Sequence, residues 1–112
     1  MQLPGAFGNL AVLQVLRIDQ NQLTSLPASF GQLTRLQHLR MDQNQLTSLP
    51  ESFGQLAALR ILRMEKNRLT SLPESMVMLR LDSFTLDRAL MSYTIREYPD
   101  TWVTGIASVT WL

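Results

Sequence analysis

The nine residues DQNQLTSLP occur at positions 19–27 and again at 42–50, and a looser copy, EKNRLTSLP, fills positions 65–73. The copies begin at positions 19, 42 and 65, so the chain repeats with a constant period of 23. Three rows of the chain, which begin at positions 3, 26 and 49, align at this period without a gap. A fixed period of this length is typical of proteins built from stacked repeats. We therefore treat one such row as the structural unit.

Each row places its apolar residues at the same positions. In the second row these are Leu26, Phe30, Leu33, Leu36, Leu39, Met41 and Leu46, and the third row matches them one period later. Burying seven such side chains contributes about 10–20 kcal/mol. Ordering the backbone of one row costs on the order of 1 kcal/mol or more for every residue. A single row cannot fold alone, so we expect the rows to stack.

The spacing inside a row predicts its shape. The segments LQVLRID, LQHLRMD and LRILRME alternate apolar and polar residues, which is typical of a short strand with one buried side. Stacked rows would place these strands in a parallel sheet. Each return segment opens with a proline (Pro27, Pro50 and Pro73), which has no amide donor for a ladder. The sequence predicts an α/β repeat solenoid with short parallel strands on one face and irregular, 3-10 or short helical returns on the other.

An asparagine follows each predicted strand at the point where the chain turns inward. These residues are Asn21, Asn44 and Asn67. A buried amide side chain can satisfy backbone N–H and C=O groups that leave the strand ladder. We interpret the three residues as a structural ladder. The alternative, three ordinary exposed turn residues, does not explain why the same side chain recurs in every row.

The pattern LxxLxLxxNxL appears at Leu13–Leu23, at 36–46 as LQHLRMDQNQL and at 59–69 as LRILRMEKNRL. It resembles the leucine-rich repeat. The period of 23 with LTSLP and SFGQL is similar to the repeats of intracellular Ras-binding scaffolds, Ras-suppressor proteins and many bacterial repeat proteins. This resemblance implies a curved solenoid whose concave strand side binds another protein, and it suggests a small GTPase or another signalling protein as the partner. It also implies a cytoplasmic location, which agrees with the absence of cysteine.

The fourth row departs from the pattern, because a strict period would place Asp82 in the core. Deleting one residue from the return segment restores the pattern as Leu81-x-x-Phe84-x-Leu86, with Ala89 in place of the asparagine. We therefore predict repeats over residues 1–90, three regular and one degenerate. Residues 91–112 do not follow the period and hold both Trp and both Tyr. We interpret them as a cap over the last row, and a docking tail is the alternative.

The outward side chains of the predicted strands form columns across the rows. One column is basic and the next acidic, and His38 lies in a third. The candidate binding residues are Arg17, Arg40, Arg63, Asp19, Asp42, Glu65 and His38. We expect this bipolar strip to fix the register of a protein or peptide partner, because arginine pairs carboxylates in a bidentate way. A solvated face that serves solubility alone is the alternative.

Composition excludes several other functions. The net charge of +1 gives no field for nucleic acid, and no apolar run is long enough to span a bilayer. With no Cys and a single His, we predict no catalytic residues, no metal site and no cofactor, and therefore no enzyme. The first row begins at Leu3 without a polar cap. A structural fragment of a longer repeat protein, or one that associates end to end, thus remains the alternative to a binding module.

Overall fold

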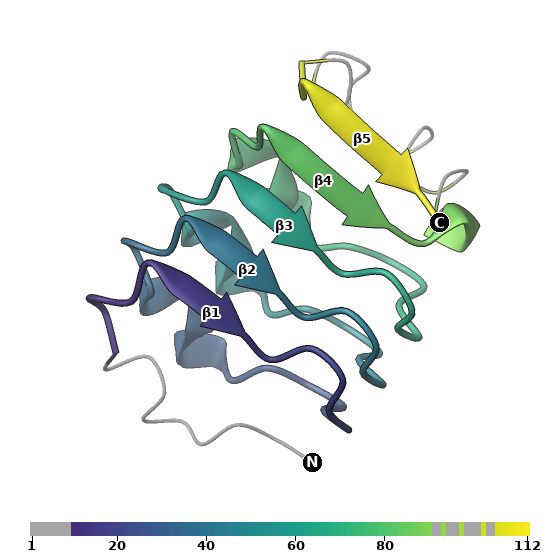
Figure 1. Cartoon of the computed structure of the whole chain (residues 1–112), viewed down its shortest axis with the longest axis horizontal. Helices are drawn as coiled ribbons and strands as arrows, with labels where there is room; N and C mark the ends of the chain where they lie inside the picture. The colour runs from purple at the N-terminus through teal and green to yellow at the C-terminus, as the bar shows by residue number, and fades with distance from the viewer. Residues whose placement is uncertain (1–9, 91–92, 94–96, 98–101, 103–104) are drawn as a thin grey trace.

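The computed structural model describes residues 10–90, 93, 97, 102 and 105–112 of the chain. Within these residues five parallel strands stand side by side in chain order, and the return segments lie behind them (Figure 1). The strands are β1 (Val15–Arg17), β2 (His38–Arg40), β3 (Ile61–Arg63), β4 (Ser83–Leu86) and β5 (Ser108–Trp111). The returns contain the 3-10 turns η2 (Ala28–Gln32), η3 (Glu51–Gln55) and η4 (Glu74–Met78), and η5 (Arg88–Leu90) follows β4. The predicted solenoid is confirmed.

The strand register follows the repeat. Leu16 pairs with Leu39, and Leu39 with Leu62, so β1, β2 and β3 are offset by one regular row each. The next offset is shorter, because Leu62 lies opposite Phe84, whereas a strict period would place Thr85 there. The one-residue deletion predicted for the return segment of row four is therefore confirmed.

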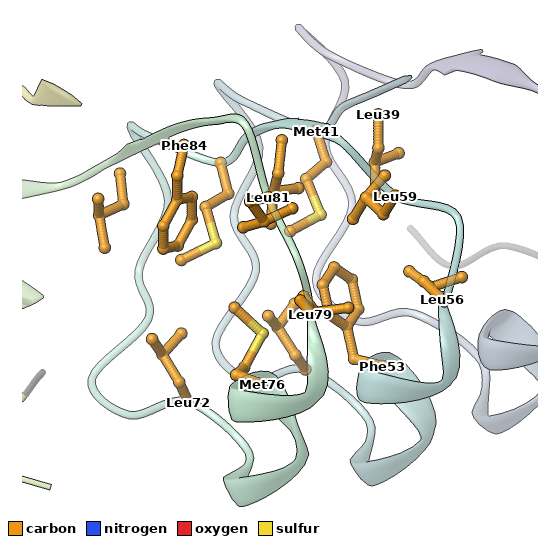
Figure 2. Packing of buried hydrophobic residues seen from close by; sticks show 14 of the residues in the cluster. Leu39, Met41, Phe53, Leu56, Leu59, Leu72, Met76, Leu79, Leu81 and Phe84 are labelled. Carbon is orange, nitrogen blue, oxygen red and sulfur yellow. The ribbon is translucent and has the colours of Figure 1, made fainter. Parts of the chain in front are cut away.

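The core lies between the sheet and the return segments. The side chains of Leu39, Leu62 and Phe84 enter it from the strands and are fully or almost fully buried. Figure 2 shows Phe53 and Met76 entering from the opposite side, where the turns η3 and η4 lie. Because each row contributes side chains at the same heights, the core runs through the stack and no row has a core of its own.

The return segments pack tightly because their sequences allow a close approach. In η2 the amide of Phe30 donates to the carbonyl of Pro27 at 2.9 Å, and η3 repeats this closure. The hydroxyl of Ser52 donates to the carbonyl of Ala28 in the row before, at 2.7 Å. A Cβ atom on Gly31 would lie 2.2 Å from the carbonyl oxygen of Ser52, so only glycine fits there. The repeated Ser-Phe-Gly therefore joins neighbouring turns.

The C-terminal residues add a fifth strand that the sequence did not predict. β5 pairs with β4, with Phe84 opposite Val109, and this offset is longer than that of the regular rows. Trp102 is buried, its indole N–H donates to the carbonyl of Leu79 at 3.2 Å, and its ring centroid is 5.9 Å from that of Phe84. Most of 91–104 lies outside the described residues, so the division of the chain at residue 90 stays a prediction.

Candidate functional site

The outward side chains of β1, β2 and β3 form a surface that we call the strand face. Its members are Val15, Arg17, His38, Arg40, Ile61 and Arg63. Each strand is three residues long, and its central leucine points into the core. The two flanking residues therefore point outward, as the alternation in the sequence predicts. The predicted residues Arg17, Arg40, Arg63 and His38 thus lie on one surface.

Two arginines of the strand face form bidentate ion pairs within their own rows. The Nε and Nη2 atoms of Arg17 each lie 3.3 Å from one carboxylate oxygen of Asp19. Arg40 binds both oxygens of Asp42 in the same way, at 3.3 and 3.2 Å. Its Nη2 also lies 3.9 Å from the Asp19 carboxylate of the row before. Arg40 is therefore held by two rows, and only 22 % of its side chain is exposed.

The acidic residues do not lie where the sequence placed them. We expected Asp19, Asp42 and Glu65 to form an outward column, but Asp42 is fully buried and Glu65 is 2 % exposed. The side chain of Asp19 is 8 % exposed. The reason is that each strand ends at its arginine, so the in-and-out alternation stops before the acidic residue. The acids thus lie beneath the arginines and are not accessible beside them.

The third row departs from the other two because it has Glu in place of Asp. The longer side chain accepts a bond from Nη2 of Arg63. Within the described part of the chain, Nε of Arg63 and Oε1 of Glu65 are buried without a hydrogen-bond partner. Buried polar atoms without partners cost about 1–3 kcal/mol, so we expect this pair to be the weakest of the three. Its arginine side chain is 38 % exposed, against 22 % for Arg40.

The ion pairs shift the ionisation of two groups. Hydrogen bonds from Arg17 hold the pKa of Asp19 below its usual value, and the positive charges of Arg17 and Arg40 act in the same direction, although partial burial opposes them. The bonds from Arg40 to Asp42 raise the pKa of the Arg40 guanidinium. Both groups therefore stay charged under ordinary conditions.

A column of less polar side chains runs across the strands beside the arginines. The register places Val15 opposite His38, and His38 opposite Ile61. Val15 is 58 % exposed and Ile61 is 36 % exposed, whereas His38 between them is half-buried. The column changes character at β4, where Ser83 lies opposite Ile61. We call Val15, His38 and Ile61 the apolar strip.

The asparagines connect the rows beneath this surface. The side-chain amide of Asn44 donates to the carbonyl of Ile18 in row one at 2.9 Å and to that of Met41 in its own row at 3.1 Å. Its oxygen accepts the amide N–H of Leu23 at 3.1 Å. Asn67 repeats all three bonds one row later. Asn21 is exposed, and its amide donates to Ile18 and Asp19 of its own row.

Sequence reasoning missed two features of these turns. Gln20, Gln43 and Lys66 have φ near +57°, a left-handed conformation that non-glycine residues rarely adopt. In row four, where Ala89 replaces the asparagine, the carboxylate of Asp87 instead accepts the backbone N–H groups of Lys66 and Asn67, the latter at 3.2 Å. Neither feature has a signal in the sequence, because the residue before the asparagine is Gln in two rows and Lys in the third, and the role of Asp87 has no counterpart in the other rows.

The described part of the chain has neither a cluster of metal ligands nor a membrane-spanning helix. It contains no group of three or more His, Cys, Asp or Glu side chains that could hold a metal ion. None of its helices is both long and apolar enough to cross a membrane.

The comparisons with known proteins agree with the repeat geometry. The family model described as leucine rich repeat matches residues 4–46. Residues 4–46 therefore match the leucine-rich repeat family, and the chain has the fold of a leucine-rich repeat solenoid. Among solved structures, a leucine-rich repeat protein from Leptospira interrogans superimposes with a TM-score of 0.67 at 25 % sequence identity. That match covers 95 % of this chain and 33 % of the Leptospira chain, so the present chain spans about a third of that relative's length. No curated protein gives a significant match.

Proposed function

We propose that this leucine-rich repeat protein is a binding module that holds a protein or peptide partner through the strand face. Leucine-rich repeats generally mediate protein–protein interaction, and they are a repeat fold that carries no catalytic activity of its own. The observation that carries the proposal is the exposure of Val15 on β1 and Ile61 on β3, which lie on the same side of the sheet. Aliphatic side chains that are exposed together on a rigid sheet favour a partner that covers them.

The proposal also names the class of protein to which the partner belongs. The sequence resemblance suggests that the partner is a small GTPase or another signalling protein and that the two proteins bind in the cytoplasm. The proposal includes no nucleic-acid partner, because the net charge is +1, and no enzymatic activity. A scaffold role in signal transduction would follow from such a partner.

Site-specific photo-crosslinking tests the binding face. A photoreactive amino acid replaces His38 on the strand face in one variant and Arg35, which is exposed on the return segment, in the other. We expect a discrete set of adducts from cell lysate with the probe at position 38 and not with the probe at position 35. Equal labelling at both positions, or none at position 38, would contradict binding through the strand face.

Self-association is the alternative function. Among the described residues β1 and β5 are the outer strands of the sheet, and parallel strands of two copies could pair there. Sedimentation velocity at several protein concentrations separates the two functions. A sedimentation coefficient that does not change with concentration supports the binding module, and one that rises steadily with concentration supports self-association.

A further inference from the structure

We propose that the segment held on the strand face is uncharged and aliphatic, adopts a polyproline II conformation, and crosses the strands along the apolar strip. This inference rests on the proposed function and names the chemistry of the partner. It replaces the expectation, drawn from the sequence, that the partner presents carboxylates to the arginine column.

The arginines are already occupied by the chain's own carboxylates. Arg17 and Arg40 each use two nitrogen atoms in a bidentate pair, and Arg63 is bonded to Glu65. A partner carboxylate that took over Arg40 would leave Asp42, which is fully buried, without its counter-ion. Removing one member of a buried ion pair is strongly unfavourable. Because three guanidinium groups meet three carboxylates, the strand face also presents no net charge to an acidic segment.

The apolar strip is the uncharged part of the strand face, whereas the exposed side chains of Arg17 and Arg63 are bonded to the carboxylates of their own rows. Val15 and Ile61 keep 58 % and 36 % of their surface exposed. The exposed residues Gln14, Gln37 and Arg60 each immediately precede a residue of the strip, and Arg60 is paired with Asp82 at 3.2 Å. The amide groups of Gln14 and Gln37 can donate hydrogen bonds to backbone carbonyls without adding charge. Polyproline II chains make no internal hydrogen bonds and leave their carbonyls open to such donors.

The distance between Val15 and Ile61 indicates which conformation of the bound segment fits the strip. Val15 and Ile61 lie two strands apart, which is about 9.6 Å at about 4.8 Å per strand. A polyproline II helix rises about 3.1 Å per residue with three residues per turn, so every third side chain faces the same side about 9.3 Å further on. Aliphatic residues three apart would thus meet Val15 and Ile61 together. A β-strand repeats its face at about 6.6 Å, which does not match.

Nuclear magnetic resonance titration of the ¹⁵N-labelled chain tests the inference. The probe is an acetylated and amidated nonapeptide with valine at every third position and proline elsewhere. A second peptide has glutamate in place of each valine. We expect the valine peptide to shift the amide signals of β1, β2 and β3 at millimolar concentration, equally at low and high salt, and the glutamate peptide to shift none of them.

Two variants make a matched pair for this titration. Ile61→Ser removes an aliphatic group from the strip, and Met78→Ser removes one from η4 on the return side, where Met78 is 64 % exposed. We expect Ile61→Ser to weaken binding of the valine peptide at least fivefold and Met78→Ser to leave it unchanged. Salt-sensitive binding of the glutamate peptide at the strand face would overturn the inference but keep the proposed function. Absence of shifts in β1, β2 and β3 with either peptide would count against both.

Discussion

Asn44 holds two rows together through a single side chain. Its amide donates to carbonyls of both rows, and its oxygen accepts from Leu23. All of these groups lie in the interior, where water cannot replace a lost partner. Asn21 has the same neighbours in sequence but is exposed and bonds within its own row. The contribution of each asparagine to the stability of the fold therefore depends on its position in the stack and not on its residue type.

We predict that Asn44→Leu lowers the free energy of unfolding by at least about 2 kcal/mol, because it leaves several buried backbone groups unpaired. Asn21→Leu is the matched control, and we expect it to cost less than about 1 kcal/mol. Chemical denaturation followed by circular dichroism measures both values. Equal losses for the two variants would show that the bonds between rows are not the source of the effect.

The ion pair of Asp19 gives the stability a predictable dependence on pH. The pKa of this carboxyl is lower in the folded chain than its ordinary value, mainly because Arg17 donates hydrogen bonds to it. A group with a lowered folded pKa stabilises the fold above its unfolded pKa, which is about 3.9, and loses that contribution as the pH falls through the folded value.

We therefore predict that Asp19→Asn is less stable than the wild type at pH 7, by up to about 1 kcal/mol for a partly exposed pair. The difference should shrink as the pH falls below about 4, because the wild-type carboxyl then takes up its proton. Urea denaturation of both proteins between pH 7 and pH 2 measures it. A difference that stays constant over that range would mean that the ion pair contributes nothing.

At the scale of the elements, the 3-10 turns stack because of their small residues. A Cβ atom on Gly31 would meet the backbone oxygen of Ser52 at 2.2 Å, and one on Gly54 would meet that of Ser75 at 2.1 Å. The Ser52 and Ser75 hydroxyls each donate back to the turn of the preceding row at 2.7 Å. Neighbouring turns are thus held at a separation that leaves no room for a methyl group.

We predict that Gly31→Ala destabilises the chain by about 1–3 kcal/mol, the range for overpacking a close contact. Ser52→Ala should cost about 1 kcal/mol through its lost hydrogen bond. The double variant should be no more stable than Gly31→Ala alone, because the atom in the way is a backbone oxygen that Ser52→Ala does not remove. Thermal unfolding of the three variants measures this. Recovery of stability in the double variant would contradict the backbone contact.

The elements also show what the sequence could predict. The register of β1 to β4 followed from the positions of leucine and phenylalanine, even where one residue is missing before Phe84. The burial of Asp42 and Glu65 did not follow, because alternation says nothing about residues beyond the end of a three-residue strand. β5 was missed because the last strand of a stack does not have to follow the 23-residue period. It needs only the free edge of β4 to pair with and a side chain, that of Val109, that points toward the core.

At the scale of the whole molecule, each row needs its neighbours to bury its apolar side chains. The stability of the stack therefore depends on what covers its end rows. The core is continuous, and a row that loses its neighbour exposes the apolar side chains that faced it. At the C-terminal end Trp102 packs on Phe84, Tyr93 donates to the carbonyl of Leu72 at 3.0 Å, and β5 pairs with β4. These contacts cover the fourth row, which lacks the asparagine of the others.

We predict that a chain that ends after Leu90 exposes the buried side chains of Leu81, Phe84 and Leu90 and leaves β4 as an open edge. It should bind a hydrophobic dye and aggregate, because an apolar surface beside an unpaired strand favours association. Trp102→Phe is the control, since it keeps an apolar ring but removes the indole N–H bonded to Leu79. It should stay soluble and lose about 1 kcal/mol. Dye fluorescence and light scattering measure both variants, and a shortened chain as soluble and stable as the wild type would show that the C-terminal residues do not protect the fourth row.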